Sequence, residues 1–194
     1  MAEQETRRPP MRQSEESDRE QLELARIQGD ALQKAVDAMD EESDSGVLVQ
    51  RAGDYEIAIA VEEAEGMWMP SDGELRWQNP VDENCHVEVC VRDGADGRFV
   101  PGLDVTVTLV HPDEKEVGTH EQPFLWHPWL YHYGRNWQVP EEGAYTVRVR
   151  VEPPAFMRHD HENGRRFLEP VEVEFADVPI EPDQKRVEDG KESR

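Results

Sequence analysis

Residues 145–151 read YTVRVRV, and this stretch decides the fold. Its apolar side chains occupy every second position and alternate with threonine and arginine, which is the period of a β-strand with one buried face. The same alternation recurs in residues 55–62, 105–109 and 171–175. Stretches rich in glycine, proline and aspartate separate these runs, and no long amphipathic helix lies between them. The pattern predicts an all-β fold, an antiparallel β-sandwich in which Tyr145 forms a tyrosine corner by binding backbone upstream.

The flanks of the sandwich differ from it in composition. We expect residues 1–17, which are polar and charged, to be disordered. The Ser-Asp pair at 17–18 offers an N-cap, and residues 18–42 are predicted as one N-terminal helix and a linker. The apolar residues of this helix fall only loosely on one face, so it packs on the domain, lies across a partner or is transient. The sandwich is predicted over 53–180, and residues 181–194 are predicted as a disordered tail.

The charge of the chain excludes two classes of partner. Lys and Arg total 21 against 44 Asp and Glu, which gives a formal net charge of −23. Such a surface repels phosphate backbones and anionic lipid, so we expect no nucleic-acid partner and no membrane-surface partner. The spread of acid along the chain resembles the acidic surfaces of proteins from salt-loving organisms, where salt screens the repulsion.

Hydropathy gives an expectation about compartment. No apolar run approaches the ~20 residues that span a bilayer, so direct membrane insertion is not expected. The first twenty residues lack the apolar core of a signal peptide. The sequence therefore predicts a soluble protein that is cytoplasmic, unless the chain begins after a removed leader.

The first candidate for a functional site is the stretch NCHVEVCV at residues 84–91. Strand alternation puts His86, Glu88 and Cys90 on one face, and Cys85 with two valines on the other. The two cysteines therefore point in opposite directions and are not expected to form a disulfide. If the valines face the core, an imidazole and a carboxylate lie two residues apart where both can reach one ion. The alternative is an ordinary strand with a solvent-facing polar side.

A second candidate is the aromatic stretch HEQPFLWHPWLYHYGRNW at residues 120–137. It places His120, His127 and His132 among three tryptophans and two tyrosines. These aromatic side chains predict either the wall of a half-buried pocket or an aromatic core or dimer interface. Imidazoles in such a wall are suited to binding a metal ion.

A third candidate is the polar loop FMRHDHENGRRF at residues 156–167, which carries His159 and His161 beside acidic residues. On its own it predicts only a loop. Together, however, three separate segments supply histidine with nearby carboxylate, and loops of a sandwich can deliver ligands to a rigid site. Nitrogen donors favour copper, iron, manganese or zinc over calcium and magnesium, so we predict a transition-metal site.

Four short motifs follow one another in a recognisable order: HVEV at 86–89, HYGRN at 132–136, RHDHENG at 158–164 and FLEP at 167–170. In order and spacing they resemble the iron-transport accessory family of bacteria. The resemblance implies an immunoglobulin-like β-sandwich that is exported, forms a homodimer and accompanies a membrane iron permease.

The resemblance also implies a metal site for copper or iron made of four residues: His86, Glu88, His132 and His159. In the family a methionine precedes the histidine of HYG by seven residues, and here that position is Leu125, which cannot coordinate. Two substitutes are available, His127 and Met69. Loss of the soft thioether leaves Fe(II), Cu(II), Mn(II) and Zn(II) open as well as monovalent copper.

The functional hypothesis from the sequence is a metal-binding protein, not an enzyme, that holds iron or copper for uptake or delivery. Two alternatives stay open. One is a metal-dependent oxidoreductase at the same site. The other is an immunoglobulin-like interaction or dimerisation module without a metal, whose aromatic segment is the contact surface.

Overall fold

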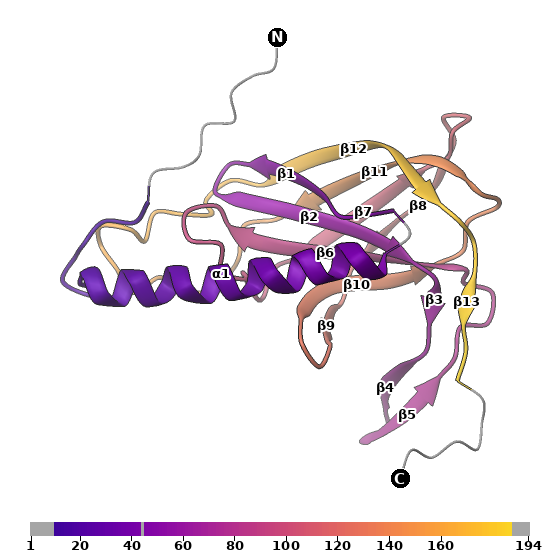
Figure 1. Ribbon diagram of the computed structural model, residues 1–194, viewed down its shortest axis with the longest axis horizontal. Coiled ribbons are helices and arrows are strands. Elements are labelled where there is room, and N and C mark those ends of the chain that lie inside the picture. The colour runs from indigo at the N-terminus through magenta and orange to yellow at the C-terminus, as the bar shows by residue number, and fades with distance from the viewer. Residues whose placement is uncertain (1–9, 44, 188–194) are drawn as a thin grey trace.

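Two antiparallel sheets face each other in a computed structural model that describes residues 10–43 and 45–187 (Figure 1). The first sheet has the order β1-β2-β6-β10-β9 and the second the order β12-β11-β7-β8. The first is built from β1 (Leu48–Ala52), β2 (Tyr55–Glu62), β6 (Cys85–Asp93), β9 (Phe124–Trp126) and β10 (Tyr131–Trp137). The second is built from β7 (Val105–Val110), β8 (Glu116–Glu121), β11 (Gly143–Val151) and β12 (Val171–Ile180). The predicted immunoglobulin-like β-sandwich is confirmed.

The hydrophobic core lies between the two sheets and follows the alternation in the sequence. On β11 the apolar positions from Tyr145 to Val151 are fully buried, and they meet the inward-facing valines of β6 and β7. The hydroxyl of Tyr145 donates a hydrogen bond to the backbone oxygen of Glu141 over 2.6 Å, which confirms the tyrosine corner. This rigid double layer holds the outer face of β6 in place.

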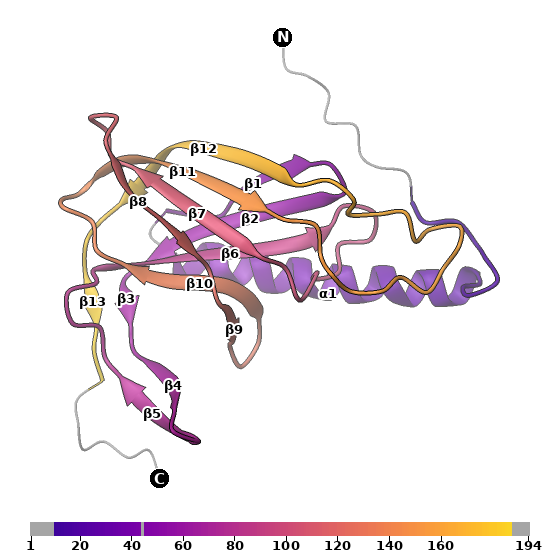
Figure 2. The same ribbon diagram turned by 180° about the vertical axis from the view of Figure 1, so that it is seen from behind.

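The N-terminal helix α1 (Arg19–Glu42) lies across the outer face of the first sheet, and Figure 2 shows it behind β2 and β6. Its N-cap is Asp18, one of the two predicted residues, and Asp18 forms a capping box with Gln21. Its side chains Val36 and Met39 pack in a second apolar cluster that includes Cys90 of β6. Of the three arrangements left open for this helix, the structure shows packing on the domain.

Gly29 explains how α1 approaches the sandwich so closely. A Cβ at this position would lie 1.8 Å from the backbone oxygen of Asp96, in the turn after β6. Any side chain larger than hydrogen would therefore push the helix away.

No helix in the part of the chain that the structure describes is long and apolar enough to cross a membrane.

Two minor sheets complete the fold. Strands β3 (Ala64–Glu65) and β13 (Gln184–Lys185) pair in parallel, whereas β4 (Met67–Ser71) and β5 (Glu74–Gln78) form an antiparallel hairpin. This β4–β5 hairpin extends away from the sandwich on the side of β9 and β10 (Figure 1).

The structure differs from the expected disorder at both flanks. The backbone of Arg12 exchanges hydrogen bonds with the side chain of Asn163, and Ser14 donates one to Asp160. In the expected C-terminal tail, β13 pairs with β3. These contacts join residues far apart in the sequence, so local composition gives no sign of them. Residues 1–9 and 188–194 and position 44, to which the predictions of disorder and of a linker also apply, lie outside the described residues.

Replacing Tyr145 by phenylalanine tests the tyrosine corner. The change removes the hydrogen bond to Glu141 while it keeps the ring in the core, and we expect the free energy of unfolding to fall by about 1 kcal/mol. Urea unfolding measures the loss. The exposed Tyr131 provides the matched control, since Tyr131→Phe is expected to change stability by less than about 0.5 kcal/mol. Equal losses in both variants would contradict the assignment.

Candidate metal centre

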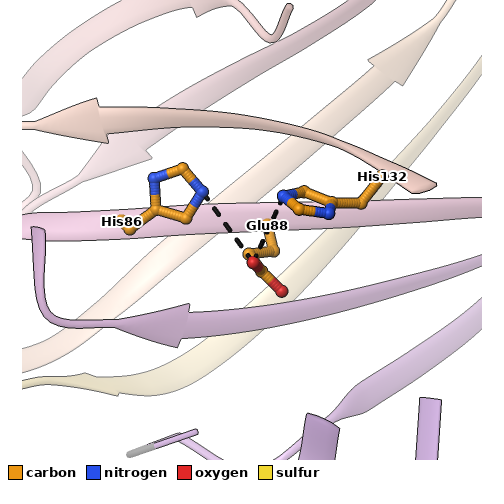
Figure 3. Close-up of side chains that lie close together, drawn as sticks. All are labelled: His86, Glu88 and His132. Carbon is orange, nitrogen blue, oxygen red and sulfur yellow. Dashed lines mark ion pairs between the residues drawn. The ribbon is translucent and has the colours of Figure 1, made fainter. Parts of the chain in front are cut away.

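Three side chains on the outer face of the first sheet converge at one point. His86 and Glu88 come from β6 and His132 comes from β10, and one ligand atom of each lies within 4.8 Å of the others. The Nε2 atoms of His86 and His132 lie 3.9 and 3.2 Å from Oε1 of Glu88 (Figure 3). This group, His86, Glu88 and His132, is called the His/Glu cluster below.

The pairing of β6 with β10 explains why these three residues meet. In the antiparallel register His86 lies opposite Asn136, and Glu88 lies opposite Gly134. Alternation then puts His132, Gly134 and Asn136 on the same face of β10. A Cβ on Gly134 would lie 2.7 Å from Nε2 of His86 and 3.1 Å from Cδ2 of His132. Glycine therefore leaves the space into which the two imidazoles and the carboxylate point.

The His/Glu cluster is buried. The exposed fractions of His86, Glu88 and His132 are 0%, 6% and 3%, and every residue of β6 is buried. The alternative of an ordinary solvent-facing strand is therefore wrong. Two further residues share this face of β6: Cys90 packs in an apolar cluster with Val36 and Met39 of α1, and Arg92 donates a hydrogen bond to Gln33 of the same helix.

A fixed amide sets the tautomer of His86. The side-chain nitrogen of Asn136 donates to the backbone oxygen of Glu65 over 2.7 Å, so its side-chain oxygen faces the other way. That oxygen lies 2.9 Å from Nδ1 of His86 and can only accept, so Nδ1 carries the proton. The lone pair of Nε2 is consequently free on the side of Glu88. An outer hydrogen bond that orients an imidazole in this way is usual for histidines that bind metals.

Both imidazoles are neutral at ordinary pH. Burial and, to a smaller extent, the neighbouring imidazoles of His86 and His127 together lower the pKa of His132 to about 3. Burial also lowers the pKa of His86, and this effect outweighs the opposite effects of Glu65 and Asn136. A neutral imidazole offers a nitrogen lone pair, which is the form that a metal ion requires.

Several nitrogen atoms at the site are buried and make no hydrogen bond. They are Nε2 of His86, both ring nitrogens of His132 and Nδ1 of His127. Buried polar atoms without a partner are rare in proteins, because each one loses its hydrogen bonds to water. A metal ion beside the carboxylate of Glu88 would satisfy one ring nitrogen of each imidazole that binds it. The residues present therefore fit a transition metal with mixed nitrogen and oxygen donors.

His127 and Met69 lie next to the His/Glu cluster but outside it. His127 is in the turn between β9 and β10, half-buried, with its ring centroid 6.5 Å from that of His132. Met69 is on β4 and lines a cavity together with Leu125, which pairs with His132 across β9 and β10. His127 remains a candidate for an additional donor by its distance from His132, and Met69 by the cavity that it shares with Leu125.

The structure places His159 apart from the three other residues of the predicted ligand set. Its side chain is 90% exposed, and its Nδ1 lies 3.1 Å from Glu16, in the segment that precedes α1. The 156–167 loop is held there by hydrogen bonds of Asp160 and Asn163 to Ser14 and the backbone of Arg12. Within one chain, His159 therefore does not join the buried imidazoles. Its role as a ligand stays a prediction that needs a second copy of the chain.

The aromatic side chains of residues 120–137 do not line the cavity of Met69 and Leu125, so in that cavity they do not form the pocket wall that was one of their two interpretations. Tyr133 and Trp137 point into the core between the sheets, whereas Trp126, Trp129 and Tyr131 are exposed. Alternation on β10 explains why Tyr133 and Trp137 face away from His132 into the core. Tyr131 shares their face but is exposed at the start of the strand. The exposed tryptophans are compatible with the other interpretation, a contact surface.

Two residues that shape the site were not singled out from the sequence. They are Gly134, which makes room for the cluster, and Asn136, which orients His86. A signal for both was present, since they follow His132 at two and four residues within HYGRN and a strand puts all three on one face.

Comparison with known proteins places the chain in a family. Residues 50–180 match the family described as "Fe2+ transport protein", and no curated protein matches the sequence. FetP of uropathogenic E. coli strain F11 is 23% identical, with a TM-score of 0.55 over 69% of this chain and 94% of that chain. A copper-bound variant of P19 from Campylobacter jejuni is 17% identical, with a TM-score of 0.58 over 70% of this chain and 95% of that chain. Copper-reconstituted P19 is 18% identical, with a TM-score of 0.56 over 69% and 94%. These structures show the same sandwich fold.

The depressed pKa of His132 predicts acid sensitivity of the metal-free protein. In the unfolded chain His132 takes up a proton near pH 6.5, whereas in the folded chain it does so only near pH 3, so acid favours unfolding between these values. From pH 7 to pH 5 the contribution of this residue amounts to about 2 kcal/mol of lost stability. Urea unfolding of chelator-treated protein checks this value. His132→Gln should lose about 2 kcal/mol less than the unmodified chain over this range, and equal losses would contradict the prediction.

Proposed function

The chain belongs to the Fe2+ transport protein family, and from this premise we propose that it binds a transition-metal ion, iron or copper, for uptake or delivery. The ligands are His86, Glu88 and His132. The observation that carries the proposal is the buried convergence of two neutral imidazoles and one carboxylate, with ring nitrogens that have no hydrogen-bond partner. The function is binding and transfer of the ion rather than catalysis.

The chemistry of the donors supports a borderline transition-metal ion, a class that includes copper and iron. Two nitrogen donors and one oxygen donor suit borderline metal ions, whereas Ca²⁺ and Mg²⁺ prefer oxygen alone. Copper-bound forms of P19, which share the fold, give independent support for copper. Zinc and manganese accept the same donors. Iron is placed ahead of them because the family is described as Fe2+ transport proteins.

A fourth donor would complete a tetrahedral site. Leu125 pairs directly with His132 but has no donor atom, so another residue must supply it. His127 is the nearest candidate, because its buried Nδ1 has no hydrogen-bond partner. Met69 reaches the same region from the β4–β5 hairpin. The third candidate is His159 from a second copy of the chain, since in one chain this side chain points into solvent.

We also infer that the chain acts as a homodimer and beside a membrane iron permease. Four aromatic side chains of the β9–β10 region are exposed: Phe124, Trp126, Trp129 and Tyr131. Exposed aromatic groups that gather in one region are typical of protein–protein contacts. The permease is inferred from the family, whose members are described as Fe2+ transport proteins.

Removal of one imidazole tests the proposed ligands. We expect His132→Ala to weaken binding of Cu(II) by at least about 100-fold, which corresponds to about 2.7 kcal/mol, because a single nitrogen and a carboxylate remain. Isothermal titration calorimetry at neutral pH measures the change. His161→Ala is the matched control, since this imidazole is fully exposed and far from the cluster in sequence. A His132→Ala protein that binds Cu(II) as tightly as the unmodified chain would contradict the proposal.

Removal of the amide that orients His86 tests the tautomer. Asn136→Ala is expected to weaken metal binding by about 10- to 100-fold, as other outer hydrogen-bond partners do, while the ligands themselves stay in place. Asn136→Asp keeps an oxygen acceptor for Nδ1–H and should recover most of the affinity. Nitrogen NMR of the imidazole reports the tautomer directly. If Nε2 of His86 carries the proton in the unmodified protein, the assignment is contradicted.

A further inference from the structure

A cavity of about 290 Å³ adjoins the His/Glu cluster. Its walls come from the β4–β5 hairpin on one side and from β9 and β10 on the other. Two of its lining residues, Met69 and Val81, are 42% and 73% exposed, so the cavity communicates with solvent. No residue of the His/Glu cluster itself lines it.

Gly134 joins this cavity to the buried imidazoles. It lines the cavity, and the position where its Cβ would be lies 2.7 Å from Nε2 of His86 and 3.1 Å from Cδ1 of Leu125. The space above Gly134 is therefore shared by a metal-binding nitrogen on one side and by a cavity-lining leucine on the other. This space therefore lies between the cavity and the buried Nε2 of His86.

Leu125 lies at the boundary between the cavity and this space, since it lines the cavity and its Cδ1 approaches the Cβ position of Gly134. Nε2 of His86 and of His132 are both fully buried, so an ion can reach them only if a side chain moves aside. Leu125 is half-buried on β9, which is the last strand of its sheet and pairs on one side only. A leucine at such an edge can change rotamer within nanoseconds when it is exposed, without disturbing the core.

The wall of the cavity offers soft donor atoms. Met67 and Met69 alternate with Trp68 on β4, and both line the cavity. Thioether sulfur prefers monovalent copper over harder divalent ions, and the unbranched methionine side chain adapts to a passing ligand. The lining of the cavity carries one negative and one positive side chain, Glu83 and Arg135. Hydrogen bonds from backbone N–H groups, chiefly that of Val81, lower the pKa of Glu83, so this carboxylate is anionic.

We propose that this cavity is the route by which the metal ion reaches and leaves the His/Glu cluster, and that it favours Cu(I). Met67 and Met69 receive the ion at the mouth, Leu125 is the gate, and Gly134 provides the opening beyond it. The inference rests on the proposed metal binding at His86, Glu88 and His132. It adds to that function a path and a preference for a soft cation.

The rates of loading and release test the route separately from affinity. A gate changes both rates by the same factor and leaves the dissociation constant unchanged, whereas a ligand changes the dissociation constant. We expect Leu125→Ala to accelerate both Cu(I) loading and release to excess chelator by about tenfold, which is the effect of about 1.4 kcal/mol on the barrier. Stopped-flow quenching of tryptophan fluorescence, under reducing and oxygen-free conditions, measures the rates.

A thioether variant tests the preference for Cu(I). Met67→Leu keeps the shape of the side chain and is expected to slow Cu(I) loading by about threefold while Zn(II) loads at the rate of the unmodified chain. Leu75→Ala is the control, because this residue is exposed on the same hairpin and does not line the cavity. It should change neither rate.

The outcomes separate the route from the function on which it rests. Unmodified protein that binds neither ion would overturn the proposed function and the route with it. Unmodified protein that binds Cu(I), together with Leu125→Ala that loads and releases at unchanged rates, would overturn the route alone. Equal slowing of Cu(I) and Zn(II) by Met67→Leu would overturn the preference for the soft ion.

Discussion

The structure depends on the burial of strand β6 on both of its faces. One face carries Cys85 and the valines of the sandwich core, and the other carries His86, Glu88 and Cys90. A polar face of a strand usually points into solvent, where water satisfies its donors and acceptors. Here water is excluded, so the imidazoles are neutral and several of their nitrogens make no hydrogen bond. This is unfavourable unless another partner binds them, and a transition-metal ion is the partner whose requirements these donors meet.

The surrounding elements each contribute to that burial. Helix α1 covers the sheet beside the cluster through Val36 and Met39, and it lies outside the range that matches the family. Strand β3 carries Glu65, whose backbone fixes the amide of Asn136 and thereby the tautomer of His86. The absence of a side chain at Gly134 keeps the centre of the cluster open. The site is therefore assembled by parts of the chain that lie far apart in the sequence.

Much of this arrangement could be predicted from the sequence, because it follows from strand alternation. The period of two in YTVRVRV gave the sandwich, and the same period placed His86 and Glu88 on one face, opposite to the core. Alternation within HYGRN, if extended from His132, also indicates Gly134 and Asn136. What alternation cannot predict is what covers a face. The weak apolar pattern of α1 did not show that the helix packs over β6, since its close approach depends on Gly29.

The position of the 156–167 loop could likewise not be predicted from the sequence. His159 lies in a motif that resembles the family's, yet its loop is tied to the segment before α1 by Asp160 and Asn163, and the imidazole points into solvent. The same limit applies to residues 120–137. The number of tryptophans and tyrosines in this segment did not predict which of them would be buried in the core and which would be exposed. Contacts between distant residues decide both cases, and they are visible only once the chain is folded.

A crystal structure of the protein loaded with copper tests the central claim most directly. The account predicts one ion between β6 and β10, bound by Nε2 of His86, a ring nitrogen of His132 and the carboxylate of Glu88, with metal–nitrogen distances of about 2.0 Å. Copper bound elsewhere, for example at the exposed His159 and His161, with no ion at the His/Glu cluster, would contradict it.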